Sequence, residues 1–352
     1  MAQGIEASME NYKLDFQEAF SQETKKWDSE LRESTSVWMG LAWAGPKIVM
    51  RKFTLVILLA FPFLKGEAQQ LHFTSQYLQH NFMYNPGAAG IANNNMIGIS
   101  YRDQWSSFPG NPKTYMLYGD FSLNKMKAGA GAYIYRDETG PTSRTGIDLS
   151  FSKHIISLDG KKKLGLGLEV RGLQYAIDKS KINIDVQGDP VLAGSGNKFA
   201  FDAGAGVYYT NQKLSVGAAV SQLIQSKLEF GSPSNANQRG KLYRHYVFNA
   251  NYKIQTGDNI YLLPNAMMRI IEHSPSEYEF GAMFNYKEKI WWGLQYRIDQ
   301  FWSMQAGVKI LQKIGLTYSY DYYQTPINVF TSGSGAHEIG IRFDLKSNSP
   351  QF

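Results

Sequence analysis

The feature that most constrains this chain is an alternation of apolar and polar residues with a period of two. In residues 164–171, leucine and valine occupy the even positions, while glycine, glutamate and arginine occupy the odd ones. Residues 276–287, 290–298 and 336–345 repeat the pattern. Because successive side chains of a strand point to opposite faces, each segment is predicted to be a strand with one apolar and one polar face. The chain is therefore expected to be all-β.

Fourteen segments of this kind follow one another along the chain. They are residues 95–103, 113–123, 128–136, 144–158, 163–175, 198–210, 214–224, 242–255, 260–273, 276–287, 290–298, 301–311, 314–322 and 336–345. Most are about as long as a tilted membrane strand of roughly 9 to 11 residues, and longer than the ~5 to 6 typical of soluble sheets. This length favours an antiparallel transmembrane outer-membrane β-barrel of about 14 strands.

The connections between these segments alternate in length. Tight turns are expected at residues 124–127, 159–162, 211–213, 256–259, 287–289 and 312–313, and long loops at 104–112, 137–143, 176–197, 224–241 and 323–335. In a meandering sheet alternate connections lie at opposite ends, so one end carries the tight turns and the other the long loops. Outer-membrane barrels show this asymmetry, with short periplasmic turns and longer external loops. Closure would also remove the sheet edges, whose unpaired backbone N–H and C=O groups cannot form hydrogen bonds with lipid.

A soluble β-sandwich or propeller of similar length is the alternative fold. A mean hydropathy of -0.34 already excludes a polytopic helical membrane protein, which needs repeated long apolar runs. Aromatic residues near strand ends favour the barrel, because they are expected to form interfacial girdles. These residues are Tyr101, Trp105, Tyr135, Tyr175, Tyr209, Trp302, Tyr318 and Tyr320.

The first 68 residues are predicted to be absent from the mature barrel. Residues 50–68 combine a basic start, an apolar core and small residues at Gly66 and Ala68, the three parts of a secretory signal peptide. Such a signal acts at a nascent N-terminus, so we expect residues 1–49 to be a mis-assigned extension and the mature chain to begin at Gln69. The alternative is a buried core segment preceded by an amphipathic helix from Met9 to Ser34. Residues 69–94 would then form a short N-terminal lead-in or plug at the periplasmic side, and residues 95–352 the barrel.

Enzymatic motifs are not found in the sequence. It has no cysteine, no G-x-S-x-G elbow, no Walker A loop, no H-E-x-x-H and no EF-hand pattern, and its six histidines are scattered. We therefore expect no enzyme, no catalytic or metal site and no cofactor. His154 and His337 are interpreted as interfacial or lumenal side chains. The side chains expected in the lumen carry both signs, which predicts cross-strand ion pairs; they are Glu169, Arg171, Glu279, Arg297, Asp299, Arg342 and Asp344.

Four short motifs follow one another between residues 73 and 114. They are Phe-Thr-Ser-Gln-Tyr at 73–77, Tyr-Asn-Pro-Gly-Ala-Ala-Gly at 84–90, Tyr-Arg-Asp-Gln-Trp at 101–105 and Phe-Pro-Gly-Asn-Pro-Lys-Thr at 108–114. Their order and spacing resemble the PorP/SprF family of type IX secretion outer-membrane proteins of Bacteroidetes. The matching family positions are Gln76, Tyr77, Asn85, Pro86, Gly90, Tyr101, Arg102, Gln104, Trp105, Gly110, Pro112 and Thr114. One departure is Gly87, where alanine is commoner.

The resemblance implies a non-enzymatic component or accessory of the type IX secretion system in the cell outer membrane. It implies export or surface attachment of a secreted partner, such as a large adhesin with a C-terminal sorting domain, and a link to gliding motility. The expected partners are the type IX machinery, that secreted protein and outer-membrane lipid, but not nucleic acid. An outer-membrane porin or FadL-like solute channel and a barrel hydrolase are the rival functions. From the residues alone, the segment before the first strand is interpreted as a plug or a plain lead-in tail, and Arg102 as stacking on Trp105 or pairing with a lumenal acid.

Overall fold

The computed structural model of the chain describes residues 74–182, 196–228, 240–325 and 327–347. The chain divides into two compact units, Met1–Phe63 and Leu64–Phe352, and all described residues belong to the second. The expected extension at 1–49, the signal peptide at 50–68 and the first residues of the lead-in, 69–73, lie outside the described residues. The middle of the two longest loops, 183–195 and 229–239, also lies outside them.

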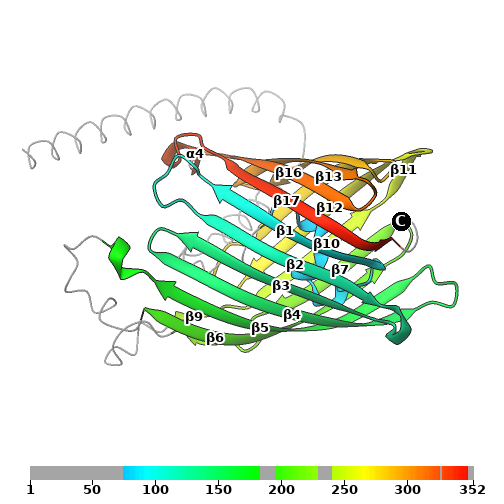
Figure 1. Cartoon of the computed structure of the whole chain (residues 1–352), viewed down its shortest axis with the longest axis horizontal. Helices are drawn as coiled ribbons and strands as arrows, with labels where there is room; N and C mark the ends of the chain where they lie inside the picture. Colours follow the sequence, from blue (N-terminus) through cyan, green and yellow to red (C-terminus); the bar gives the residue numbers. More distant parts are fainter. Residues whose placement is uncertain (1–73, 183–195, 229–239, 326, 348–352) are drawn as a thin grey trace, which may run out of the picture. The chain divides into compact units, whose positions relative to one another are not determined.

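The second unit is a closed antiparallel barrel of fourteen strands, as predicted (Figure 1). Hydrogen bonds join each strand to its neighbour along the chain, and β1 pairs with β17 to close the sheet. The strands are β1 (Asn94–Gln104), β2 (Lys113–Leu123), β3 (Ala128–Thr139), β4 (Thr142–Ile156), β5 (Lys163–Ile177), β6 (Asn197–Thr210), β7 (Leu214–Ser221), β10 (His245–Tyr252), β12 (Ile260–Ile271), β13 (Glu277–Tyr286), β14 (Ile290–Arg297), β15 (Phe301–Ile310), β16 (Ile314–Tyr323) and β17 (Ala336–Ser347).

Three short strands stand apart from this ring. The predicted strand 242–255 is interrupted at Lys253, where the chain leaves β7, and β11 (Ile254–Gly257) continues it beside β12 alone. The pair β8 (Lys227–Leu228) and β9 (Gly240–Lys241) forms a separate two-stranded sheet within the connection between β7 and β10. None of the helices among the described residues is long and apolar enough to cross a membrane.

The two ends of the barrel differ as the sequence predicts, except that the long loop expected at 137–143 is a turn of two residues, because β3 continues to Thr139 and β4 begins at Thr142. The connections after β2, β4, β6, β11, β13 and β15 are tight turns, while the long loops follow β5, β7 and β16 at the other end. The loop after β16 contains α4 (Ile327–Phe330), and Figure 1 places α4 and the last residues of β17 at opposite ends. We call these ends the turn end and the loop end.

The outer face of the barrel is apolar and the inner face is polar. Within β5, for example, Leu168 is 68% exposed, whereas Arg171 is 3% exposed. Exposed apolar side chains also point outward from other strands of the barrel, among them Ile99, Leu117, Leu149, Phe201, Phe280, Trp292 and Ile341. An apolar belt around a sheet without edges is what a bilayer requires.

Four side chains depart from the predicted faces; one is Trp105, expected in the aromatic girdle, which packs against the buried residues Phe301 and Tyr323. Tyr135 and Tyr175 were expected in the aromatic girdle but point inward, because Tyr135 shares the face of buried Tyr133 and Tyr175 packs against the same internal cluster. Trp302 and Tyr318 do point outward as expected. Asp299 was expected in the lumen but is exposed, because β14 ends at Arg297 and a positive φ of 58° at Asp299 breaks the alternation.

Candidate functional site

Residues 74–93, which precede β1, lie inside the barrel and are called the inner segment. The segment folds into three short 3-10 helices, η1 (Tyr77–Gln79), η2 (Asn81–Met83) and η3 (Pro86–Ala88). Most of its side chains are removed from solvent: Phe82 is 2% and Ala89 0% exposed. The candidate functional site is the contact between this segment and the lumenal wall.

Local sequence explains the shape of the inner segment. Proline is favoured at the first position of a helix, and Pro86 occupies that position in η3. The Asn85 side chain caps η3 by accepting a hydrogen bond from the Gly87 amide at 2.9 Å. Gly90 has a φ of +62°, a conformation that glycine adopts without steric cost, and its amide donates to Asp120 at 2.6 Å. These residues turn the chain so that it enters β1.

The wall beneath η3 is a row of small residues that crosses five neighbouring strands. Strand register aligns Gly129 with Ser152, Ser152 with Gly167, Gly167 with Gly206 and Gly206 with Ala219. We call these five positions the small-residue row. A Cβ atom on Gly129 would overlap the carbonyl oxygen of Ala89, and one on Gly167 would overlap Pro86. The absence of side chains at the three glycines of the row therefore lets the inner segment approach the wall backbone to backbone.

Hydrogen bonds fix the inner segment against this part of the wall. The Ser152 hydroxyl donates to the Gly87 carbonyl at 3.0 Å, and Asn85 donates to the Val207 carbonyl at 3.0 Å. The His154 ring lies 2.9 Å from the carbonyl oxygen of Ala89, and Lys163 donates to the Ile91 carbonyl at 2.8 Å. His154 is thus a lumenal side chain. These buried polar groups of the segment find wall partners, as burial favours, whereas the two ring nitrogens of His80 have no hydrogen-bond partner among the described residues.

An ion-pair cluster on the opposite side of the barrel holds the start of the inner segment. Arg102 of β1 lies 2.6 Å from Asp321 of β16 and 3.4 Å from Glu338 of β17. Ser75 donates its amide to Glu338 at 2.9 Å and its hydroxyl to Asp321 at 2.7 Å. Of the two expected roles for Arg102, pairing with a lumenal acid is therefore the one observed. Removing one partner of such a buried cluster would leave an uncompensated charge, at a cost of about 3–5 kcal/mol.

The other lumenal charges also form ion pairs: those of Arg171 with Asp148 and of Arg297 with Glu279 join neighbouring strands, as the mixed signs predict, whereas those of Arg171 with Glu169 and of Arg342 with Asp344 each lie within one strand. Arg171 lies 2.7 Å from Asp148 and 3.2 Å from Glu169, and Arg297 lies 2.7 Å from Glu279. Arg342 and Asp344 are 3.0 Å apart. These pairs stiffen the wall on which the inner segment lies.

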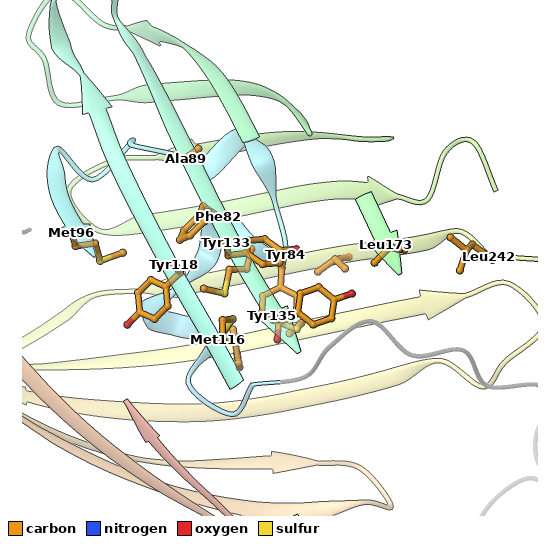
Figure 2. Packing of buried hydrophobic residues seen from close by; sticks show 14 of the residues in the cluster. Phe82, Tyr84, Ala89, Met96, Met116, Tyr118, Tyr133, Tyr135, Leu173 and Leu242 are labelled. Carbon is orange, nitrogen blue, oxygen red and sulfur yellow. The ribbon is translucent and has the colours of Figure 1, made fainter. Parts of the chain in front are cut away.

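Aromatic rings fill the space between the inner segment and the wall. Phe82 meets Tyr133 edge-on, with ring centroids 6.2 Å apart, and Figure 2 shows both rings in the buried cluster with Tyr84, Tyr118 and Tyr135. His80 packs on Tyr118 at 4.2 Å. Burial, aided by Arg342, lowers the pKa of His80 to about 3, so its ring is neutral at physiological pH.

The family positions named from the sequence fall into two groups. Gln76, Tyr77, Asn85, Pro86 and Gly90 are buried in the inner segment; Tyr77 donates to Asn265 at 2.7 Å and Gln76 to the Glu338 carbonyl at 3.3 Å. The second group lies at the loop end of β1 and β2, where the Gln104 amide donates to the Pro112 carbonyl at 2.9 Å. Trp105 packs on Tyr323 at 5.6 Å.

The rest of the second group surrounds the first loop. Gly110 has a φ of +74° and accepts a hydrogen bond from the Gly140 amide at 2.8 Å. Thr114 is paired with Arg102 across the two strands, and Tyr101 packs on Tyr115 at 5.1 Å. The structure thus brings Arg102 to the inner segment, while the others shape a loop.

Sequence reasoning named two wall residues that contact the inner segment, Arg102 and His154, but missed the others. Asp120, Asp321 and Glu338 were not singled out, nor were the glycines of the small-residue row. One signal for the row was present: β3, β5 and β6 each contain a Gly-x-Gly run, at 129–131, 165–167 and 204–206. Glycine weakens a strand interior and often marks a close backbone approach, so three such runs indicate a contact surface.

These features define a class of protein: an outer-membrane β-barrel whose lumen contains the segment that precedes its first strand. The chain belongs to a family within that class, because a model of the type IX secretion system membrane protein PorP/SprF matches residues 66–343. Membership implies association with the type IX secretion machinery. None of the curated proteins compared with the chain matches it.

Several solved barrels are similar to this chain at low identity. The toluene transporter TbuX of Ralstonia pickettii is 10% identical with a TM-score of 0.46, and the alignment covers 75% of this chain and 93% of TbuX. A Pseudomonas aeruginosa FadL homologue is 13% identical with a TM-score of 0.43, covering 74% of this chain and 93% of the homologue. Omp33 of Acinetobacter baumannii is 7% identical with a TM-score of 0.42, covering 72% and 98%.

A methyl group in the small-residue row is expected to loosen the inner segment. In Gly167→Ala the new Cβ overlaps Pro86, an overpacking that costs about 1–3 kcal/mol. Gly172→Ala is the matched control on the same strand, because its Cβ meets only ordinary contacts, the nearest at 3.4 Å. The chain has no cysteine, so a Met83→Cys substitution, at a position 2% exposed in the parent, introduces a unique reporter thiol.

We expect maleimide labelling of this reporter thiol to be about tenfold faster when Gly167→Ala is added, and to stay within twofold of the Met83→Cys parent when Gly172→Ala is added. Heat-modifiable migration of each variant on a gel verifies that the barrel is folded. Equal labelling rates in the two folded variants would contradict the contact.

Proposed function

We propose that this barrel is a non-enzymatic accessory of the type IX secretion system that supports export or surface attachment of a secreted partner. A large adhesin with a C-terminal sorting domain is the kind of partner expected. The observation that carries the proposal is the combination of PorP/SprF membership with a lumen occupied by the inner segment. A barrel filled in this way acts through its two ends rather than through an open pore.

The filled lumen supports this role over that of a porin or FadL-like channel. The inner segment contacts both halves of the wall, with η3 against β4, β5 and β6 and Ser75 against β16 and β17. In this role the inner segment is a plug. Several buried contacts, including the Arg102 cluster, would have to break together before a solute passed.

The long loops are the surfaces that we assign to the secreted partner. The loops after β5, β7 and β16 share one end of a rigid barrel, and binding residues commonly lie on loops that a scaffold positions. The first and last loops are tied to each other: Ser107 donates to the Thr331 carbonyl at 2.9 Å, and the Trp105 amide donates to the Gly335 carbonyl at 2.8 Å. Hydrogen bonds therefore hold the first and last loops together at the loop end.

The lumenal acids and bases support a non-enzymatic role. Asp148, Asp321, Glu279 and Glu338 each lie in an ion pair with an arginine, where they brace strands or hold the inner segment. Among the described residues no group of three histidine, aspartate or glutamate side chains is placed to hold a metal ion.

Deletion of the gene tests the function directly. We expect one large surface protein to be retained in the cell or lost to the medium, and the others to be displayed normally, because an accessory serves a particular partner. Quantitative proteomics of surface-shaved cells and of the medium measures this. Complementation with the full chain restores display, and normal display of every surface protein in the deletion strain would contradict the proposal.

Planar-bilayer conductance tests the role of the inner segment. The parent barrel is expected to show no sustained conductance, because the lumen is occupied. Deleting residues 74–93, or replacing Gly167 by leucine, is expected to open the lumen and produce steps of current. Sustained conductance by the folded parent at low voltage would instead favour the porin.

A further inference from the structure

A cavity of about 430 Å³ lies inside the barrel at the turn end. Its inner end is formed by the inner segment, through Leu78, Asn81 and Phe82, and its rim by the β6–β7 and β13–β14 turns. Its volume falls within the ~300–1,000 Å³ range of ligand sites. Because the segment forms the inner end, a ligand enters from the turn side.

The cavity carries an excess of positive charge. Its lining includes six bases and two acids; the bases are Lys213, Lys253, Lys287, Lys289, Lys309 and Arg342, and the acids are Asp120 and Glu288. A third acid, Asp344, pairs with both Lys309 and Arg342. Six bases therefore face three acids, and three positive charges remain in excess. Asp120 is occupied by the Gly90 amide.

The lysines at the rim are available to a ligand. Lys213, Lys287 and Lys289 are exposed, and within the described ranges none of them has an acid within the 4.0 Å limit of an ion pair. Lysine is a compact charge on a flexible stem, which suits carboxylates presented in varied geometries better than a fixed bidentate fork.

The surrounding turns extend this positive field. Five of the six tight turns contain lysine, with Lys125, Lys127, Lys161, Lys162, Lys213, Lys287, Lys289 and Lys313 against the acids Asp159, Asp258 and Glu288. A mouth lined by one sign of charge raises the local concentration of an oppositely charged partner and speeds its association.

The walls of the cavity indicate the class of ligand. Amides of Gln79, Asn81 and Asn285 stand beside apolar Leu263 and Met283. Such a lining can bond a peptide backbone and also contact apolar side chains, which a bare phosphate does not need. The site faces the lumen rather than the apolar outer belt, so lipid head groups are not its natural occupants.

We propose that the turn-end cavity is a docking site for an acidic polypeptide segment presented from the periplasm. The positive rim attracts the acidic side chains, and the amides within the cavity bond the backbone. This assignment is independent of which protein the loop end serves.

The test uses the purified full barrel in nanodiscs of zwitterionic lipid and a fluorescein-labelled oligoglutamate peptide. Fluorescence anisotropy at low salt is expected to show saturable binding that weakens steeply as salt is added. Lys287→Gln/Lys289→Gln removes two rim charges and is expected to weaken binding about fivefold. Lys161→Gln/Lys162→Gln is the matched control, an exposed lysine pair in the β4–β5 turn at the same end but outside the cavity lining; its affinity should stay within twofold.

Three results would overturn the proposal. Equal losses in the two lysine pairs would show a diffuse charge effect. Full competition by inorganic phosphate, at a constant ionic strength set with chloride, would show a simple anion site. Loss of peptide binding when anionic phosphatidylglycerol is added to the nanodiscs, with the rim lysines required, would assign the site to lipid.

Discussion

The contact on which the structure depends is the approach of backbone to backbone between η3 and the small-residue row. A barrel of fourteen strands encloses more space than its wall side chains alone fill, and here the chain fills much of that space with the segment that precedes its first strand. The glycines of the row make this possible, because a side chain at Gly129, Gly167 or Gly206 would overlap the segment. The segment then completes an internal core of tyrosine, phenylalanine and methionine that the wall cannot form alone.

Ion pairs and hydrogen bonds also hold the inner segment in the lumen. The lumen holds charged side chains that burial would penalise if they were unpaired. The wall pairs them across strands, and at Arg102 it includes the inner segment in the pairing through Ser75. One cluster therefore joins the two strands that close the barrel to the segment that fills it. The outer face of the barrel contacts lipid, and most of the interior is packed and its charges are paired. The loops and the turn-end cavity are therefore the surfaces that partners can reach.

Much of this fold could be predicted from the sequence, because a strand reveals its two faces by a local pattern. The alternation around Leu168 and the unequal connections were sufficient for the strand number, the closure and the difference between the two ends. Local pattern is less reliable at strand ends, where a single turn residue such as Asp299 breaks the alternation of faces. It also fails to separate an inward tyrosine such as Tyr135 from one in the girdle, because both suit a strand.

The site itself depended on register and could not be predicted in full. Gly129, Ser152, Gly167 and Gly206 are far apart in the chain and meet only because the strands pair as they do. Motif resemblance located the inner segment through Asn85, Pro86 and Gly90, yet it named none of the wall residues that hold them. The Gly-x-Gly runs were visible, but only the paired sheet shows that they face a common partner.

Hydrogen exchange of residues 74–93 in the membrane-embedded barrel tests the central claim most directly. The amides of Ser75 and Gly90 donate to the buried carboxylates of Glu338 and Asp120, at 2.9 and 2.6 Å. A segment held in this way is predicted to exchange over hours, as slowly as the neighbouring strands β1 and β2. Exchange of the whole segment within seconds, at the rate of an open tail, would contradict its place inside the barrel.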